Sequence, residues 1–405
     1  MHNKDNKDAN MMKNKLSVVI AATLVSLTST AQAAQEVGIY NVASMSGTFA
    51  NFGHQGEKGA RLAVETAAPI DGVNLKLVTV DTESNAGKAS RKVKSIIAED
   101  EGRYFVGSTL SSTALAVGKE VNRTGGVYMT GSGADEITGI ECNKATFRWS
   151  APTYGAVNAS LRPLLDKYPE IKRIYSITPQ YVFGDAMLEN TKMVAEERGV
   201  ELVGNSYHSL KEKEFSGYLT QAMAAKPDLL VLHNFGSQAT ATIQQAVNFG
   251  MKNRMKILLV WSNGLDQMRT LGSTVSDGLY FGSQYWHEDQ NPANQELVKL
   301  AQEKLGETPT YPMAHYYQMS KLMIDSIRAV GNDPMKVRTH LEGLNYEGVT
   351  GKEVVRTADH QIEKSFYLLQ GKGEAAMTDS SDFADIVATN KYFVAADKTG
   401  CNMGI

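Results

Sequence analysis

Two short loops carry the residue types that could hold an anion. "GSTLSSTA" spans residues 107–114 and "TGSGAD" spans residues 130–135. Each places small hydroxyl residues at the start of a predicted helix, where free backbone N–H groups and the positive end of the helix dipole favour negative charge. A carboxylate would suit both. Helix capping by serine explains either loop alone, so the pairing of the two at one sheet edge is what favours a binding site.

A glycine-rich segment suggests nucleotide binding as an alternative to a carboxylate site. "SMSGTFANFGHQGEKGARLAVE" (44–65) follows an apolar run, and we expect a loop here, with the first helix opening at "GARLAVETA" (59–67). A dinucleotide loop needs G-x-G-x-x-G and a P-loop needs G-x-x-x-x-G-K-[ST], because the backbone must close on phosphate. Neither string occurs in this segment. It predicts only a loop at the ligand-binding edge of an open α/β sheet.

Catalytic patterns are missing from the sequence. G-x-S-x-G, H-E-x-x-H and C-x-x-C do not occur, and the eight histidines are scattered. Aromatic residues instead fall at predicted strand ends and in loops, where such side chains commonly line ligand pockets, although any one of them could be core. These residues are Phe52, Trp149, Tyr154, Tyr181, Phe183, Phe235, Trp261, Tyr285 and Trp286. We expect a binding protein with no catalytic residue, cofactor or metal.

The elements that must position these residues alternate between short apolar runs and longer segments of helical period. That alternation is typical of α/β units with a parallel sheet. A first series ends at "VYMTGS", and the rhythm restarts after Trp149 and runs to "GLYFGSQYW". Two helical patterns follow (295–305 and 313–330), and "GKEVVRTADHQIEKSFYLLQGKG" predicts a hairpin or meander. The fold class is therefore α/β, with two doubly wound parallel-sheet lobes joined by several crossovers that form a hinge.

Length, charge and the N-terminus limit the function further. A chain of 405 residues predicts roughly two domains, and a net charge of −3 gives no reason to expect nucleic acid. Lys13 and Lys15 precede the apolar stretch "LSVVIAATLVSL" and the small-residue tripeptide ending at Ala33, so residues 1–33 read as a secretory signal peptide cleaved near Ala33. The acidic residues before Met11 and Met12 are unusual in a signal, so translation could start at either methionine.

The two cysteines, Cys142 and Cys401, both lie in the predicted mature chain. An exported chain with an even number of cysteines favours a disulfide, which would staple the C-terminal tail to the main body. Two free buried thiols are the alternative. A metal site is disfavoured because no histidine stands near either cysteine at ligand spacing.

With these features in hand, the chain resembles the type I periplasmic solute-binding proteins, and among them the leucine/isoleucine/valine-binding family that feeds ABC importers. The family's first loop, S-G-x-x-A-x-x-G, is matched by Ser46, Gly47, Ala50 and Gly53, and further matches are "QYVFG" and the K-x-F-S string at 213–216. The order and spacing of these strings carry the resemblance over essentially the whole mature chain.

The resemblance implies a set of ligand contacts. It places the ligand carboxylate at Ser111 and Ser132, with Ser112 and Ala134 beside them in the same two loops. Aromatic contacts would come from Phe52, Phe183 and Phe235, within a wider candidate set that adds Trp149, Tyr154, Tyr181 and Tyr285. Amino-acid binders of the family carry an acid where this chain has Asn263, so a standard amino acid is in doubt unless Asp266 or Asp135 substitutes.

A two-cysteine subgroup of the same family is more similar, and it is linked to aromatic carboxylates. It matches Cys142, the stretch "ATFRWSAPTY", the pair Tyr285-Trp286 and Cys401. We therefore expect the periplasmic substrate-binding component of an ABC importer, a monomer that partners a membrane permease. Lobe 1 would combine 34–153 with 286–348, and lobe 2 would combine 154–285 with 349–405. Amino-acid binding is the alternative ligand class; a ligand-sensing module or an exported hydrolase is the alternative function.

Overall fold

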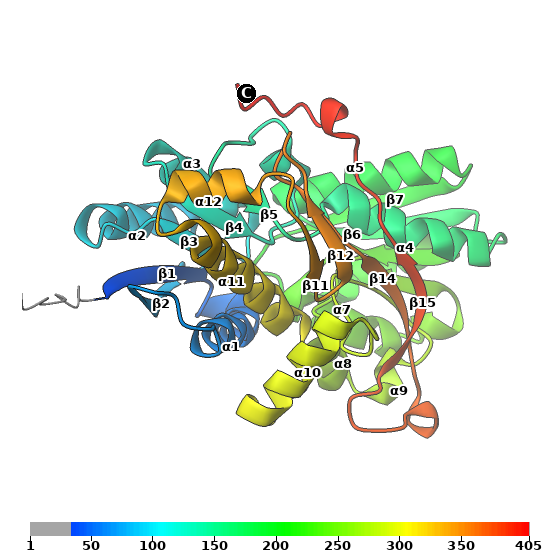
Figure 1. The fold of residues 1–405 in the computed structure, drawn as a ribbon. Coiled ribbons are helices and arrows are strands. Elements are labelled where there is room, and N and C mark those ends of the chain that lie inside the picture. Colours follow the sequence, from blue (N-terminus) through cyan, green and yellow to red (C-terminus); the bar gives the residue numbers. More distant parts are fainter. Residues whose placement is uncertain (1–33, 405) are drawn as a thin grey trace, which may run out of the picture.

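A computed structural model describes residues 34–404 of the chain. The predicted signal peptide (1–33) and both alternative start methionines lie outside the described residues. Two large sheets organise the fold, and in Figure 1 the blue-to-cyan N-terminal part and the green middle part of the chain lie side by side. The predicted α/β class with parallel sheets is confirmed. None of the helices within 34–404 combines the length and hydrophobicity needed to cross a bilayer.

The first sheet has five parallel strands in the order β2-β1-β3-β4-β5. Strands β3 and β4 are buried along their whole length, which is why they read as short continuous apolar runs. The strands are β1 (Gln35–Ala43), β2 (Val73–Asp81), β3 (Tyr104–Gly107), β4 (Val127–Thr130) and β5 (Thr146–Arg148). The helices that accompany this sheet are α1 (Ala50–Glu65), α2 (Ala86–Glu99), α3 (Ser111–Arg123), α11 (Tyr311–Val330) and α12 (Pro334–Leu341). Helix α10 (Pro292–Leu305) contacts the small sheet described below.

The second sheet repeats that order and then extends it. Its parallel part runs β7-β6-β8-β9-β10, the same arrangement as in the first sheet, and β14 and β15 add to it antiparallel. The strands are β6 (Arg173–Pro179), β7 (Glu201–His208), β8 (Leu229–Leu232), β9 (Lys256–Leu259), β10 (Tyr280–Ser283), β14 (Phe366–Gly371) and β15 (Ala384–Asn390). The accompanying helices are α4 (Thr153–Lys167), α5 (Val182–Glu197), α6 (Ser216–Ala224), α7 (Gly236–Asn248), α8 (Leu265–Leu271) and α9 (Ser273–Ser276).

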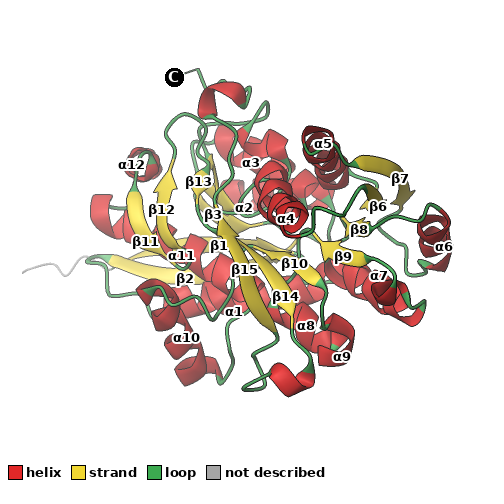
Figure 2. Cartoon of the chain, turned by 90° about the vertical axis from the view of Figure 1, so that its right-hand side faces the viewer, coloured by secondary structure: helices red, strands yellow, loops and turns green. Residues whose placement is uncertain are grey.

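The chain passes between the two large sheets three times, after β5, after β10 and before β14. A small antiparallel sheet lies beside these crossovers and consists of β11 (Asn345–Gly348), β12 (Gly351–Val355) and β13 (Ile362–Glu363). Figure 2 shows it apart from the strands of the second sheet. The crossovers are tied by side chains: the amide of Gln284 accepts from the N–H of Ala151 and donates to its carbonyl, both at 3.0 Å.

The glycine-rich segment was predicted to be a loop, and this prediction is wrong because most of the segment is helix. Helix α1 begins at Ala50 and not at Gly59, so two of the expected loop glycines, Gly53 and Gly56, lie inside it. A Cβ on Gly53 would lie 2.0 Å from the Ser44 carbonyl oxygen, and one on Gly59 would lie 2.0 Å from the Met313 carbonyl oxygen. The glycines are therefore needed for close packing of α1, which explains their spacing without any phosphate.

The C-terminal part differs from the predicted hairpin or meander. Residues 351–363 form part of the small sheet, whereas β14 leaves it and joins the second large sheet beside β10. A strand at "TFR" was not predicted, and it adds β5 to the edge of the first sheet. In both places the choice of sheet depends on partners distant in the sequence.

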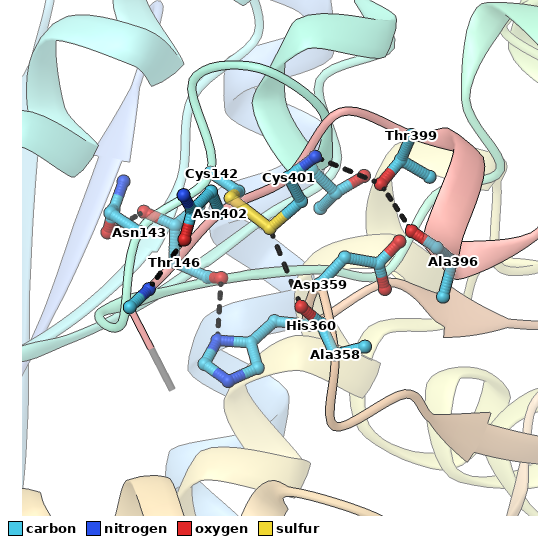
Figure 3. Close-up of a disulfide and its surroundings, with 12 residues drawn as sticks. Cys142, Asn143, Thr146, Ala358, Asp359, His360, Ala396, Thr399, Cys401 and Asn402 are labelled. Atoms are coloured by element: carbon cyan, nitrogen blue, oxygen red, sulfur yellow. Dashed lines mark hydrogen bonds between the residues drawn. A yellow bond between two sulfur atoms is a disulfide. The ribbon is translucent and has the colours of Figure 1, made fainter.

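The predicted disulfide is confirmed, because Cys142 and Cys401 are bonded. Cys142 lies between β4 and β5 of the first sheet, and Cys401 lies in the tail that follows β15 of the second sheet. Figure 3 shows Cys401 Sγ close to the Ala358 carbonyl, at 3.5 Å. The tail therefore returns from the second sheet to the first and is held there covalently.

Candidate functional site

The loops at the carboxyl ends of both large sheets meet around one small enclosed cavity. The first sheet contributes the start of α1 and the loops after β3 and β4. The second sheet contributes the start of α5 and the segments after β8 and β9. Tyr311 at the start of α11 completes the wall. The lining residues are Phe52, Ser108, Thr109, Gly131, Ser132, Gly133, Tyr181, Phe183, Phe235, Trp261 and Tyr311. This is the position at which open α/β sheets bind ligands.

One side of the cavity presents hydroxyl groups. Gly107 ends β3 with φ +113° and Ser108 follows with φ +72°, so the backbone turns sharply at the strand end. A Cβ on Gly107 would lie 2.5 Å from the Val42 carbonyl oxygen, which explains the glycine. The hydroxyls of Ser108 and Thr109 are buried and have no hydrogen-bond partner among residues 34–404. Buried polar groups are usually paired, so these two hydroxyls are candidates for contact with a ligand.

The second hydroxyl loop, after β4, is held in place by the first. The Ser132 hydroxyl donates to the Ser108 carbonyl at 2.8 Å, and the Ser111 hydroxyl accepts from the Ala134 N–H at 3.1 Å. Ser132 lines the cavity, whereas Ser111 and Ala134 are buried behind it and join the two loops. Ser112, the next residue of α3, is exposed.

The other side of the cavity is aromatic. Phe183 contacts Trp261 edge to face with ring centroids 5.4 Å apart, and Phe52 contacts Phe235 at 5.4 Å and Tyr311 at 5.5 Å in the same manner. Such edge-to-face contacts hold aromatic rings in defined orientations. Phe52 and Tyr311 belong to helices of the first sheet, whereas Phe183, Phe235 and Trp261 follow strands of the second sheet. Contacts between the two sheets therefore order this wall.

None of the eleven lining residues carries a charge. Arg148 is a fully buried cation, and it donates to the carbonyls of Gly133 and Ala134 in the second hydroxyl loop. Burial lowers the pKa of Arg148 to about 10, so the guanidinium stays charged at neutral pH. A fixed positive charge behind the loop favours an anion in front of it.

The acids that could serve a ligand ammonium lie outside the cavity. Asp135 accepts from the Tyr154 N–H at 3.0 Å and from the Asn190 side-chain amide at 2.7 Å, so both of its oxygens are engaged. Asn263 and Asp266 line a separate hollow between the start of α1, α7 and α8. A zwitterion in the aromatic cavity would therefore find hydroxyls for its carboxylate and no acid for its ammonium.

The remaining predicted residues are not brought to the cavity. Trp149 is buried behind it, where its ring stacks on His315 with centroids 5.5 Å apart and its indole N–H donates to Glu353 at 2.8 Å. Tyr154 lies in the first turn of α4. Tyr285 is 1% exposed in the crossover after β10. Of the twelve predicted ligand contacts, the cavity collects Phe52, Ser132, Tyr181, Phe183 and Phe235.

Sequence reasoning missed several lining residues. Ser108 and Thr109 belong to the loop "GSTLSSTA", but the choice within that loop fell on Ser111 and Ser112, because the side-chain directions depend on the sharp turn at Gly107. Trp261 was noted only as one of the aromatic residues at strand ends. Tyr311 had no signal at all, since it comes from a distant helix. No group of three or more histidine, cysteine, aspartate or glutamate side chains in residues 34–404 is placed to hold a metal ion.

The fold and the site define a class of two-sheet ligand-binding proteins, and comparison with known proteins specifies the family. The family model described as "Periplasmic binding protein" matches residues 36–376. The chain therefore belongs to the periplasmic binding protein family, as the sequence motifs predicted.

Individual similar proteins are also named as binding proteins. An amino acid ABC transporter substrate-binding protein from Pseudomonas fluorescens Pf-5 is 54% identical with a TM-score of 0.89, and the match covers 91% of this chain and 100% of that one. The leucine-specific-binding protein of Salmonella typhimurium is 21% identical over 84% of this chain and 92% of its own. A solute-binding protein from R. palustris, solved in complex with benzoate, is 20% identical with a TM-score of 0.80, covering 91% of this chain and 99% of that one, and shows the shared fold.

Proposed function

We propose that this protein is the periplasmic substrate-binding component of an ABC importer and that its ligand is a small carboxylate with an aromatic or hydrophobic body. The importer role is supported by membership of the family and by the 54% identical relative, which is named as a substrate-binding protein of an ABC transporter. The partner is then a membrane permease, and the protein works as a monomer in the periplasm after loss of residues 1–33.

The observation that carries the ligand class is the composition of the cavity wall. Unpaired hydroxyls of Ser108 and Thr109 stand on one side, aromatic rings stand on the other, and the lining residues carry no charge. Hydroxyl donors bind a carboxylate through charge-assisted hydrogen bonds, and aromatic walls take an apolar ring. An ammonium enclosed there without an acidic partner would be strongly unfavourable, which is why we place an aromatic carboxylate ahead of an amino acid.

Binding requires the two sides to separate, because the cavity has a volume of only about 10 Å³, about the size of one water. In the proposal, lobe 1 (34–153 plus 286–348) and lobe 2 (154–285 plus 349–405) open about the three crossovers and close on the ligand. Closure is driven by the higher affinity of the closed state, since the ligand then contacts both sides at once. The permease recognises the closed form.

Amino-acid binding remains the second candidate, because the 54% identical relative is named for amino acids. The ammonium would then have to reach Asp266, which lines the neighbouring hollow. Catalysis is a weaker candidate. His233, which directly follows β8, is held between the hydroxyls of Thr178 and Thr191 at 2.9 Å each, so its ring nitrogens are not free to act as a base.

A thermal-shift screen followed by calorimetric titration tests the proposal. Benzoate and para-hydroxybenzoate are expected to raise the melting temperature of the purified protein, whereas leucine and phenylalanine should not, because a ligand stabilises only the fold that binds it. If leucine raises the melting temperature and the aromatic acids do not, the assigned ligand class is wrong. Slow consumption of a bound ligand would show an enzyme instead.

A pair of threonine variants locates the carboxylate. Thr109→Val removes a cavity hydroxyl and should weaken benzoate binding about tenfold or more, the usual effect of losing a hydrogen bond to a charged group. Thr113→Val is the matched control, since its hydroxyl is also buried without a partner in the described chain but lies in α3 away from the cavity. Equal loss in both variants, or in neither, would contradict the proposed position of the carboxylate.

A further inference from the structure

Two polar residues join the large sheets beside the second hydroxyl loop. Asp135 ends that loop and opens a short 3₁₀ helix (Asp135–Thr138) after β4 of the first sheet. Asn190 lies in α5, which packs on the second sheet. The Asn190 side-chain amide donates to one oxygen of Asp135 at 2.7 Å, and the N–H of Tyr154, at the start of α4, donates to the other at 3.0 Å. We call Asp135 and Asn190 the clasp.

The clasp is shielded from solvent and its geometry is fixed. Asn190 is 9% exposed, and its NH₂ group also donates to the Ala186 carbonyl at 2.8 Å, one turn earlier in α5. That second bond orients the amide, so that its N–H and not its oxygen faces Asp135. A hydrogen bond to a carboxylate is roughly twice as strong as one between neutral groups. The clasp is therefore a strong contact between residues that come from different sheets.

The clasp connects the two walls of the aromatic cavity through the backbone. Asp135 lies three residues after Ser132, which lines the cavity, and α5 carries Phe183, another lining residue, in its first turn. Neither Asp135 nor Asn190 lines the cavity itself. Moving the second hydroxyl loop away from α5 therefore requires the clasp to break.

The contact between the sheets at the starts of α1 and α7 is of a weaker kind. Phe49 stacks on Phe235 with ring centroids 5.9 Å apart, and the Ser237 hydroxyl donates to the Thr48 carbonyl at 3.3 Å. Ser237 and Thr48 are both exposed, so water competes for that hydrogen bond. Of these two contacts, the shielded and charge-assisted clasp is the one expected to resist separation of the sheets more.

We propose that the Asp135–Asn190 clasp holds the two walls of the cavity closed around a ligand and so sets the residence time of that ligand. This inference rests on the proposed function, because it requires the two lobes to open and close. Asn190 is a positioning residue, since it acts through α5 and the second hydroxyl loop and does not touch the ligand. A weaker clasp lowers the fraction of closed protein and leaves the open form as receptive as before. The clasp therefore acts on dissociation and not on association.

Rapid-mixing measurements with benzoate test this inference. Asn190→Leu removes the amide with little change in volume, and Asn190→Asp sets a second carboxylate against Asp135. Benzoate should dissociate about tenfold faster from Asn190→Leu than from the unaltered protein, as expected for loss of a hydrogen bond to a charged group, and faster still from Asn190→Asp. The association rate constants should stay the same. Unchanged dissociation in both variants, or an equal effect on association, would overturn the clasp.

Asn205→Leu is the matched control. Asn205 is a half-buried asparagine in β7, and its side-chain oxygen accepts from the Ser176 and Thr178 hydroxyls within the second sheet. Its loss should lower the melting temperature without changing either rate constant, because no bond to the first sheet is involved. Faster dissociation in Asn205→Leu as well would mean that any weakening of the second sheet releases the ligand, and would contradict a specific role of the clasp.

A rescue variant connects the effect to the paired residues. Asp135→Asn combined with Asn190→Asp removes the like charges, so benzoate should dissociate more slowly from the double variant than from Asn190→Asp. Equally fast dissociation from both would contradict the clasp.

Small-angle X-ray scattering of the ligand-free proteins provides a readout that does not depend on the ligand. The radius of gyration should be larger for Asn190→Asp than for the unaltered protein, because like charges push the sheets apart, and should decrease again in the double variant. If benzoate does not bind the unaltered protein, the ligand class of the proposed function is wrong, and scattering then decides on the clasp. Equal radii of gyration for the three proteins would in that case overturn it.

Discussion

At the scale of single residues, the crossovers contain a buried lysine, Lys364, and no carboxylate among residues 34–404 lies within hydrogen-bond reach of its ammonium. Lys364 lies between β13 and β14, and its ammonium donates to the carbonyls of Gln284 at 2.6 Å and Ser365 at 2.8 Å. It also lies 4.2 Å from the centre of the Trp149 ring. Loss of solvent on burial lowers the pKa of Lys364 to about 7, and Glu353 opposes this only in part. The cation therefore ties two crossovers at some cost in stability.

Lys364→Met should change how stability depends on pH. The pKa of Lys364 is about 7 in the folded protein and 10.5 without burial, so between these values the unfolded chain binds more protons than the folded one. The contribution of Lys364 to the free energy of unfolding consequently rises with pH in that window, by up to about 1.4 kcal/mol per pH unit. Urea unfolding at several pH values should show this slope in the unaltered protein and not in Lys364→Met.

Lys211→Met provides the control for that experiment, because Lys211 is an exposed lysine in the segment between β7 and α6 and is not among the charges that shift the pKa of Lys364. Its unfolding curves should keep the pH dependence of the unaltered protein. Parallel pH profiles for the unaltered protein and Lys364→Met would show that the lysine does not lose its proton in the folded state over this range.

At the scale of elements, the contact between α1 and α11 determines where the first loop of the site ends. The two helices approach so closely that Gly59 faces the backbone of Met313 and Tyr317, and Gly56 faces the ring of Tyr316. Helix α1 carries Phe52 and α11 carries Tyr311, so the same packing brings two walls of the aromatic cavity together. The glycines of α1 therefore support the site through helix packing.

Gly59→Ala should separate these helices. A Cβ at this position would lie 2.0 Å from the Met313 carbonyl oxygen, so α1 must shift, and overpacking of this kind typically destabilises by about 1–3 kcal/mol. Gly217→Ala in α6 is the control, since its Cβ meets nothing within 4 Å and alanine favours helix. Thermal unfolding should show a lower melting temperature for Gly59→Ala and an equal or higher one for Gly217→Ala. Equal behaviour of the two variants would mean that the helix contact is looser than the structure shows.

At the scale of the whole molecule, the tail after β15 adds a fourth link between the two sheets. Arg356 donates to the Val394 carbonyl at 2.7 Å along this tail, and the Cys142–Cys401 bond holds its end beside β5. The bond closes a loop of 259 residues that contains the whole second sheet. It therefore restricts the unfolded chain over most of its length.

Removal of the disulfide should lower stability without removing the ligand site. Cys142→Ala combined with Cys401→Ala is expected to cost about 2–4 kcal/mol, seen as a lower melting temperature, because the unfolded chain gains freedom. Benzoate affinity should change little, since both cysteines lie away from the aromatic cavity. A reducing agent should lower the melting temperature of the unaltered protein and leave the double variant unaffected. A melting temperature independent of the bond would show that the tail detaches before the sheets unfold.

The features that could be predicted from the sequence are those that depend on residues close together in the chain. Hydrophobic periodicity is local, so it was enough to predict the repeated α/β series and the α/β class. Cysteine count and export were enough to predict the Cys142–Cys401 bond. Strand ends are also local features, and for that reason Phe52, Phe183 and Phe235 could be picked out before the cavity that they line was known.

Tertiary structure decided everything that depends on distant backbone. Only tertiary contacts explain why Gly53 and Gly56 lie inside a helix, where Gly53 packs against the Ser44 carbonyl and Gly56 against the Tyr316 ring of α11. Only the turn at Gly107 directs Ser108 and Thr109 towards the cavity, while Ser111 contacts the next loop. Tyr311 lines the cavity because the packing of α11 brings it there from a distant part of the chain. The type of each residue and the period of the pattern can be read from a short stretch of sequence. The direction of a side chain and the choice of a neighbouring strand depend instead on steric contacts between segments that are distant in the sequence.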